Sequence, residues 1–120
     1  RSFYTGDVTF VELNTTEGEV GIYARHIPMT MIIAPGVLTI TEEDGTKKKA
    51  ALLKGFVEVT ETTMSILAEV AEWPEDIDIE RAKKAEERAR KRIESKSADI
   101  DIARAELALK RALVRKGLKA

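Results

Sequence analysis

The stretch Glu72-Trp-Pro-Glu-Asp-Ile-Asp-Ile-Glu-Arg-Ala82 divides the chain into two parts that have different sequence periods. Before it, short runs rich in β-branched residues are separated by turn signals. After it, alanines recur at helical spacing among charged residues. The division predicts an α+β fold, in which an N-terminal antiparallel β-sandwich (residues 1–73) precedes a C-terminal antiparallel two-helix hairpin (residues 74–120).

Five runs before the division are predicted as strands: Val8–Leu13, Val37–Ile40, Ala50–Leu53, Phe56–Val59 and Met64–Val70. Asp44-Gly45 is a strong hairpin signature, because both turn residues tolerate positive φ. The strands are short and no helical period lies between them. This pattern favours an antiparallel sandwich or barrel over an α/β fold.

Two helices are predicted after the division, over about residues 78–94 and 100–116, with a polar break at residues 94–98 between them. Each carries a stripe of small apolar residues on one face. The first stripe is Ala82, Ala85, Ala89 and Ile93, and the second is Ala105, Ala108, Leu109 and Ala112. Two helices joined by a short loop form an antiparallel hairpin.

The sequence DIDIERA at Asp76–Ala82 returns as DIDIARA at Asp99–Ala105, with six of seven letters unchanged. Each copy stands where a helix begins, and Asp78 and Asp101 are suitable N-cap residues. Their carboxylates accept unpaired backbone N–H groups and oppose the positive end of the helix dipole. Capping explains both copies without a ligand. The alternative is that one copy has been adapted to bind one.

The predicted hairpin is marginally stable by itself. Burying a methylene-sized group contributes about 0.8 kcal/mol, whereas ordering one residue costs on the order of 1–2 kcal/mol. Ion pairs between Glu80 and Lys84 and between Glu86 and Arg90 are expected to offset part of this cost. A ligand present at one hundred times its dissociation constant adds about 2.7 kcal/mol. The hairpin is therefore a plausible switch.

The composition narrows the function. The chain of 120 residues has no cysteine and one histidine, which excludes disulfides, thiolate zinc sites and cysteine nucleophiles. No membrane-length apolar run or signal peptide is present, so a cytosolic protein is expected, and the missing initiator methionine suggests a fragment. Residues 1–74 carry 6 basic against 11 acidic residues, and residues 75–120 carry 14 against 10. An acidic body with a basic arm favours an acidic partner for the arm.

Other candidate sites have simpler explanations. His26 has no partner cluster and is expected to be a structural loop residue. Asp76, Asp78 and Glu80 diverge in direction at a helix start, so a metal site is not expected there. Lys47–Lys49 follows a turn and is expected to be a solvated hairpin edge. With no catalytic motif in the sequence, an independent enzyme is not expected.

Several stretches, taken in order, resemble the epsilon subunit family of bacterial rotary ATP synthase. They are Gly18–Ile22, His26–Pro28, Pro35-Gly36, Gly55–Val59, Ala68–Glu72, Ile77–Ala82 and Arg104–Ala112, and the ordered set covers essentially the whole chain. Tyr23-Ala24-Arg25 and Lys54-Gly55 depart from the family pattern, which leaves the detail of the sandwich contacts open. Family members have a further strand before Arg1, which we expect to be missing here.

The resemblance implies a non-catalytic rotor subunit. In this family the sandwich joins the gamma subunit to the c-ring of the membrane sector. The helices fold down or extend into the alpha/beta catalytic head, and the extended form blocks ATP hydrolysis. It also implies a peripheral protein on the cytoplasmic face of the bacterial membrane, with no insertion of its own. The coupling ion, proton or sodium, is chosen elsewhere in the complex.

In some family members the folded hairpin binds ATP, and the resemblance carries that motif onto Ile77, Asp78, Arg81 and Ala82. A preceding acidic residue matches Glu72, and basic residues on both helices match Arg88, Arg111 and Arg115. ATP is then expected as a regulatory ligand, and no cofactor is required. The second copy of the repeated sequence also fits the motif, so what distinguishes the first is its place beside Glu72.

Two rival functions remain open. A nucleic-acid-binding module would use the basic helices and bind in a salt-dependent way, although Glu residues interleave the arginines and no aromatic lines the helices. A free-standing ATP sensor would bind nucleotide without a partner complex. Co-purification with a gamma subunit would favour the rotor subunit over both.

Overall fold

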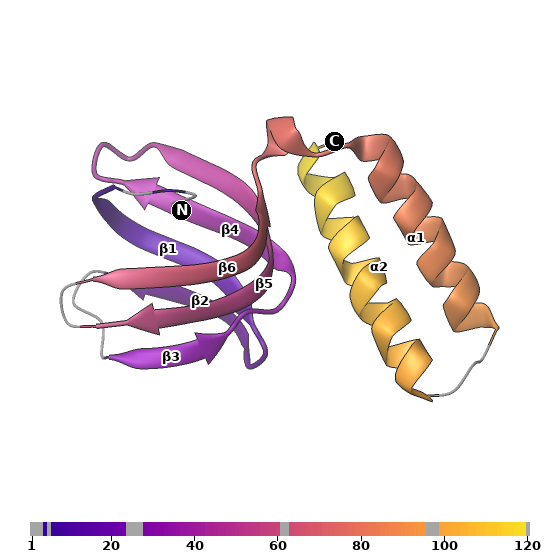
Figure 1. The fold of residues 1–120 in the computed structure, drawn as a ribbon. Coiled ribbons are helices and arrows are strands. Elements are labelled where there is room, and N and C mark those ends of the chain that lie inside the picture. The colour runs from indigo at the N-terminus through magenta and orange to yellow at the C-terminus, as the bar shows by residue number, and fades with distance from the viewer. Residues whose placement is uncertain (1–3, 5, 24–27, 61–62, 96–98, 120) are drawn as a thin grey trace. The chain divides into compact units, whose positions relative to one another are not determined.

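The computed structural model describes residues 4, 6–23, 28–60, 63–95 and 99–119, without the side chains of residues 99–101. It divides into two compact units, Arg1–Trp73 and Pro74–Ala120. We call these the strand unit and the helical unit (Figure 1). An antiparallel sheet followed by two helices confirms the predicted α+β class.

The strand unit contains six antiparallel strands joined in one sheet. They are β1 (Val8–Thr15), β2 (Gly18–Tyr23), β3 (Met29–Ile32), β4 (Gly36–Glu42), β5 (Lys47–Val59) and β6 (Met64–Glu72). The order across the sheet is β2-β1-β4-β5-β3, and β6 also pairs with β5. The short strands β2 and β3 were not among the predicted strands. The predicted strands Ala50–Leu53 and Phe56–Val59 prove to be two parts of the single long strand β5.

Strand β5 is long enough to pair with three other strands. Its first part pairs with β4 and its last part pairs with β3, while β6 runs along its other edge. The register between β5 and β6 shifts on both sides of Lys54, next to Gly55, whose φ of 142° is open to glycine alone. A bulge of this kind bends a strand and increases its twist. The sheet therefore curves round on itself, as Figure 1 shows.

One hydrophobic core fills the curved sheet. It consists of Val11, Leu13, Ile22, Met31, Ile33, Leu38, Ile40, Leu52, Val57 and Val59. These residues lie in the strands β1 to β5 or in the segment that follows β3, so all five strands contribute to a single interior. The alternation of buried and exposed residues along β4 and β1 is typical of strands with one face toward such a core.

The turn between β4 and β5 forms at the predicted Asp44-Gly45 signature. Gly45 has a positive φ of 88°, and its N–H donates to the carbonyl oxygen of Glu42 over 3.0 Å. The Asp44 carboxylate accepts a hydrogen bond of 2.9 Å from the backbone N–H of Thr46. That bond lowers the pKa of Asp44 below its usual value. This hairpin prediction is confirmed.

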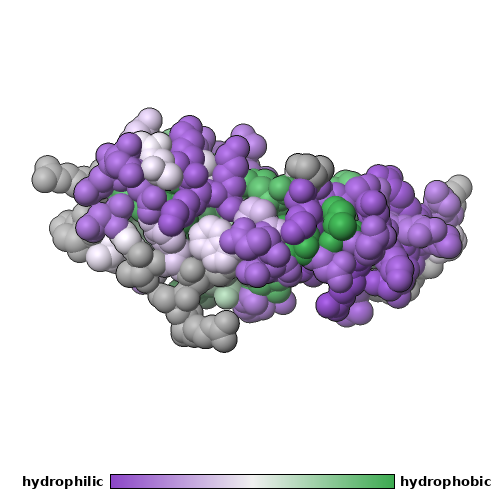
Figure 2. Space-filling view, turned by 90° about the horizontal axis from the view of Figure 1, so that it is seen from above, coloured by the Kyte–Doolittle hydropathy of each residue, from purple (hydrophilic) through white to green (hydrophobic). Residues whose placement is uncertain are grey.

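The helical unit contains a short 3₁₀ turn η1 (Pro74–Asp76) and the helices α1 (Ile79–Glu94) and α2 (Asp99–Lys119). The helices lie side by side in opposite directions (Figure 1). In the described part of the helical unit, four alanines are at most 3% exposed, namely Ala82, Ala89, Ala105 and Ala112. They form the seam between the helices, so the prediction of an alanine-lined hairpin is confirmed. Hydrophilic residues cover most of the rest of the helical surface visible in Figure 2.

Candidate functional site

Asp78 begins α1 in the way that its sequence position predicts. Its backbone is extended, with φ −89° and ψ 103°, and its Oδ1 accepts the backbone N–H of Arg81 at 3.2 Å. Its carbonyl oxygen accepts the N–H of Ala82 at 3.1 Å. The carboxylate therefore satisfies a donor that would otherwise have no partner at a helix start.

The second copy of the repeated sequence is used differently. α2 begins at Asp99, so Asp101 lies within its first turn and is not the N-cap, contrary to the prediction. Aspartate is favourable within the first turn of a helix as well as at its N-cap, so the sequence alone does not decide between these positions. The helix also continues past the predicted end at residue 116 and finishes at Lys119.

The predicted motif residues divide into a buried pair and an exposed set. Ile77 and Ala82 are only 4% and 2% exposed. Asp78, Arg81 and Arg88 are exposed. The apolar members therefore support the packing of the helix start, while the charged members remain accessible to a ligand.

The predicted residues on α2 are Arg111 and Arg115, and both are half-buried. The Nε atom of Arg111 is buried, and no hydrogen-bond partner for it lies among the residues that the structure describes. A buried guanidinium donor without a partner is costly, because the loss of its water is not compensated. An acceptor oxygen from a ligand would remove that cost.

The spacing of these arginines places them on one edge of the hairpin. Arg81, Arg88 and Arg111 each directly precede a seam alanine, and Arg115 lies three residues after Ala112. At 3.6 residues per turn, both offsets point to the same side of the seam. In an antiparallel pair, equal offsets on the two helices fall on the same edge. We call Arg81, Arg88, Arg111 and Arg115 the arginine edge.

The opposite edge of the hairpin carries an ion-pair network centred on Glu86. Its carboxylate accepts a bond of 2.6 Å from Lys116 Nζ of α2 and one of 2.9 Å from Arg90 Nε of α1. These bonds, the one from Lys116 first, lower the pKa of Glu86. The sequence predicted the pair with Arg90 and missed Lys116. Glu80 was expected to pair with Lys84, but the structure pairs it with Lys83 at 3.6 Å.

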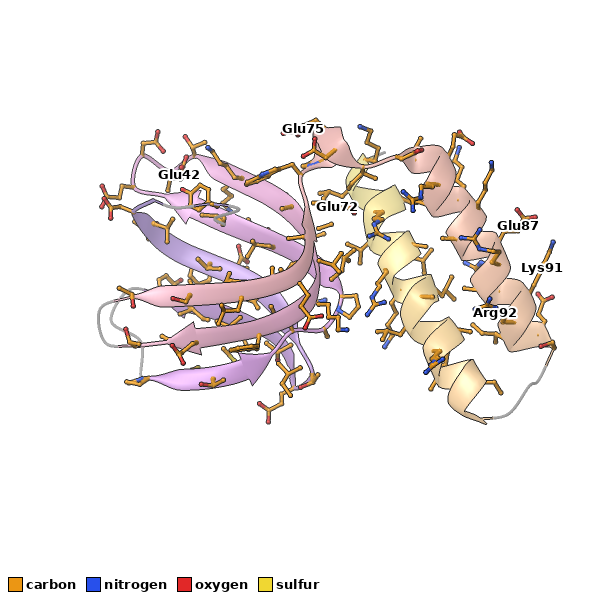
Figure 3. All side chains as sticks on the ribbon, viewed as in Figure 1. Glu42, Glu72, Glu75, Glu87, Lys91 and Arg92 are labelled. Carbon is orange, nitrogen blue, oxygen red and sulfur yellow. The ribbon has the colours of Figure 1, made fainter. Side chains whose placement is uncertain are left out.

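The outward face of α1 carries an exposed pair that contrasts with this network. Glu87 and Lys91 project from the outer side of the helix in Figure 3, and their charged atoms lie 3.9 Å apart. Their side chains are 70% and 75% exposed, whereas the Glu86 side chain is 15% exposed. Pairs as exposed as Glu87 and Lys91 contribute little to stability.

Glu72 is the one predicted site residue that lies outside the helical unit. It is the last residue of β6, in the strand unit, and pairs in register with Ala51 of β5 (Figure 3). Its side chain is half-buried. The seven other predicted residues, Ile77 to Arg115, all belong to the hairpin or its leading turn.

Trp73, which follows Glu72, is held by an aromatic and charged cluster within the strand unit. Its ring meets that of Tyr4 edge-on, with centroids 6.5 Å apart. The Tyr4 hydroxyl donates to Glu42 over 2.6 Å, and this bond raises the pKa of Tyr4 to about 12. Lys48 lies 5.6 Å from the Tyr4 ring centroid and 3.8 Å from Glu42. One lysine of the Lys47–Lys49 run thus stabilises the end of the strand unit.

The outer face of the curved sheet carries a row of exposed apolar side chains. Ile32 of β3 is opposite Phe56 of β5, which is opposite Leu67 of β6. They are 63%, 43% and 51% exposed. The adjacent row in register, Thr30, Glu58 and Ser65, is polar. A contiguous apolar row with a polar border is typical of a protein-binding surface.

Within the described part of the chain, no group of three or more histidine, aspartate or glutamate residues could hold a metal ion. His26 falls outside the described residues. Among those described, no helix is both long and apolar enough to cross a membrane.

Comparison with protein-family models gives two matches that together span most of the chain. Residues 1–74 match the beta-sandwich domain of the ATP synthase delta/epsilon chain. Residues 75–115 match the long alpha-helix domain of the ATP synthase delta/epsilon chain.

Individual proteins give the same result. An ATP synthase epsilon chain of Caldanaerobacter subterraneus is 44% identical over 96% of this chain and 83% of its own length. One from Halalkalibacterium halodurans is 47% identical over 91% and 82%. A solved structure of the Euglena gracilis mitochondrial ATP synthase, comprising OSCP, F1 and the c-ring, contains a similar chain. It is 31% identical with a TM-score of 0.79, over 92% of this chain and 69% of that one.

Proposed function

The chain belongs to the ATP synthase delta/epsilon family as an epsilon chain, a non-catalytic subunit of the central stalk, and on that premise we propose a role for each of its two units. The strand unit joins the gamma subunit to the c-ring. The helical unit restrains ATP hydrolysis when it extends toward the alpha/beta head, and it binds ATP when it is folded. The complex would hold this subunit at the cytoplasmic face of a bacterial membrane that conducts protons or sodium ions.

The apolar row Ile32, Phe56 and Leu67 supports the docking role of the strand unit. Three adjacent, half-exposed apolar side chains lose water when a partner covers them, and each buried side chain of this size contributes about 1.5–3 kcal/mol at full burial. The solved relative comes from a structure that contains F1 and the c-ring. A stalk protein of this kind is expected to present such a surface to its neighbours.

The charge and packing of the helical unit support the inhibitory role. Residues 75–120 carry an excess of four positive charges, and the arginine edge displays several of them along one side of the hairpin. An acidic surface on the alpha/beta head would attract that edge. The alanine seam buries little area, so the two helices can separate at modest cost.

The arginine edge also supports ATP binding. Guanidinium groups present forked donors that match phosphate oxygens, and four of them come together from two helices. The buried Nε of Arg111, which has no partner among the described residues, is the single observation that carries this part of the proposal. A phosphate oxygen would satisfy that donor. Ile77 and Ala82 would keep the helix start packed, and the exposed Asp78 carboxylate would be available to the base.

ATP binding of this kind would shift the equilibrium between the folded and the extended hairpin. A ligand that binds only the folded hairpin stabilises it by about 2.7 kcal/mol at one hundred times its dissociation constant. That gain is comparable with what a few buried alanines contribute. The fraction of folded hairpins would then rise with the ATP concentration.

Reconstitution tests the proposal. The chain is added to an alpha/beta/gamma complex from a close bacterial relative, and ATP hydrolysis is measured at low and high ATP. We expect co-purification with gamma, together with inhibition that is strongest at low ATP. A Phe56→Ser variant should bind gamma more weakly, while Ser65→Ala, in the adjacent polar row, should bind like the parent. Failure to bind gamma with ATP binding retained would indicate a free-standing sensor instead.

A further inference from the structure

We infer that the last turn of α2 is a clasp that holds the helical hairpin closed, on the edge opposite the arginines. The clasp consists of Lys116 and Lys119 with their partners Glu86 in α1 and Pro74 in η1. All four residues belong to the helical unit. Its contacts all lie within that unit, so the clasp does not rest on the proposed function.

The contact between Lys116 and Glu86 is the stronger half of the clasp. It spans 2.6 Å between Nζ and Oε1, and the two side chains are 36% and 15% exposed. Arg90 donates to the other oxygen of the same carboxylate over 2.9 Å. Charge-assisted bonds of this length, with limited access to water, are less screened than pairs on the open surface. This ion pair joins the two helices directly, since Glu86 belongs to α1 and Lys116 to α2.

The second half of the clasp fastens α2 to the turn that precedes α1. Lys119 Nζ donates to the carbonyl oxygen of Pro74 over 3.0 Å. The same carbonyl accepts the N–H of Ile77 at 3.2 Å, so both of its acceptor positions are used. Lys116 and Lys119 are three residues apart, which puts them on neighbouring parts of one helix face. The last turn of α2 is therefore bonded both to α1 and to η1, which precedes α1.

The clasp acts where the hairpin is otherwise weak. The seam alanines contribute little buried area. On the far edge, Arg81, Arg88 and Arg111 carry like charges, which repel one another when no anion is bound. A negative group placed between two positive ones on the opposite edge counters this repulsion. The clasp thus adds to the free energy of opening that the apolar contacts supply.

The clasp lysines lie beyond the end of the family-model match. The match to the long alpha-helix domain ends at residue 115, and Lys116 and Lys119 follow it. The match therefore does not itself imply a clasp.

Distance measurement between two spin labels tests the clasp in the full chain. Because the chain has no cysteine, Lys84→Cys and Lys110→Cys, both at exposed positions, give two unique labels on α1 and α2. Pulsed electron resonance then gives the populations of closed and open hairpins without nucleotide. The variants are Glu86→Gln, Lys116→Gln, Lys119→Met and the charge swap Glu86→Lys with Lys116→Glu.

We expect Glu86→Gln and Lys116→Gln each to raise the ratio of open to closed hairpins several-fold. The charge swap should recover much of the closed population, and Lys119→Met should have a smaller effect. The matched control Glu87→Gln should behave like the parent, because that carboxylate is exposed and pairs only along α1.

Equal distance distributions in the parent, Glu86→Gln and Lys116→Gln would overturn the clasp. So would a swap variant that is more open than either single variant, or a Glu87→Gln variant that opens as much as Glu86→Gln. A loss of helical circular dichroism in a single variant that the swap restores would support it. None of these outcomes depends on ATP binding, which fails or succeeds separately in the nucleotide titration.

Discussion

Lys116 Nζ lies 2.6 Å from Glu86 Oε1 and joins the last turn of α2 to the middle of α1. Lys116 follows the buried Ala112 by four residues, and Glu86 follows the buried Ala82 by four. Equal offsets in antiparallel helices fall on one edge, and the contact bears this out. The arginines directly precede a seam alanine or follow one by three residues, and at 3.6 residues per turn both positions lie on the other edge. The hairpin thus has a closing edge and an anion-binding edge.

The ion pairs of the closing edge should stabilise the hairpin less at low pH. The bonds from Lys116 and Arg90 lower the pKa of Glu86 in the folded chain, while an unfolded glutamate titrates near pH 4.3. A depressed folded pKa stabilises the fold fully above the unfolded value. That stabilisation disappears as the pH falls through the folded pKa. We expect the thermal midpoint of the parent to exceed that of Glu86→Gln at pH 6, and the two to converge toward pH 2.

Following helical circular dichroism during thermal unfolding at several pH values checks this expectation. Glu87→Gln serves as the control and should track the parent at every pH. A constant gap between the parent and Glu86→Gln from pH 6 to pH 2 would mean that the carboxylate charge does not stabilise the hairpin.

Substitutions of Asp78 distinguish its structural role as a helix cap from a role in ligand binding. Asp78→Ala removes the acceptor for the Arg81 N–H and should destabilise the helical unit by about 0.5–2 kcal/mol, whereas Asp78→Ser keeps an acceptor and should cost much less. Urea unfolding measures both. If Asp78→Ser is stable but binds ATP poorly, the carboxylate contacts the ligand as well. Equal destabilisation by both variants would argue against capping.

Two glycines should respond in opposite ways to replacement by alanine. At Gly55, with φ 142°, a Cβ would collide with the carbonyl oxygen of Leu67, so Gly55→Ala should weaken or unfold the strand unit. Gly117 lies in α2 with open space around it, so Gly117→Ala should stabilise the helix by up to about 1 kcal/mol. Unfolding of each variant, followed by circular dichroism, measures both effects. A Gly55→Ala chain as stable as the parent would contradict the bulge at this position.

The alanine seam should reject larger side chains. Ala105 is 1% exposed at the seam, so Ala105→Leu should force the helices apart and cost about 1–3 kcal/mol. Ala103, two residues earlier, is exposed, and Ala103→Leu should be nearly neutral. Denaturant unfolding compares the two variants. Similar stabilities for both would mean that the helices are not closely packed along this line.

The period change after Trp73-Pro74 was enough to predict the fold class and the hairpin. Strand details depended on contacts that the sequence does not display. Gly55 lies between two predicted strands, and only its pairing with the β6 backbone shows that the chain continues through a bulge. The strands β2 and β3 are short, and no prediction from the residue pattern included them.

In the hairpin, local rules succeeded where both partners lie on one helix. Arg90 is four residues from Glu86 and was predicted, and Asp78 was predicted as a cap. Lys116 is 30 residues from Glu86. It becomes a neighbour only through the register of the two helices, which the alanine seam sets. The start of α2 was predicted wrongly because aspartate is favourable within the first turn of a helix as well as at its N-cap.

Calorimetric titration of ATP into the isolated chain tests the central claim most directly. The variants are Arg111→Ala and Arg81→Ala, with Lys91→Ala as a control that removes one positive charge from the outer face of α1. The account predicts saturable binding by the parent and by Lys91→Ala, and a large loss in both arginine variants. No binding by the parent at millimolar ATP, or equal binding by all four chains, would contradict it.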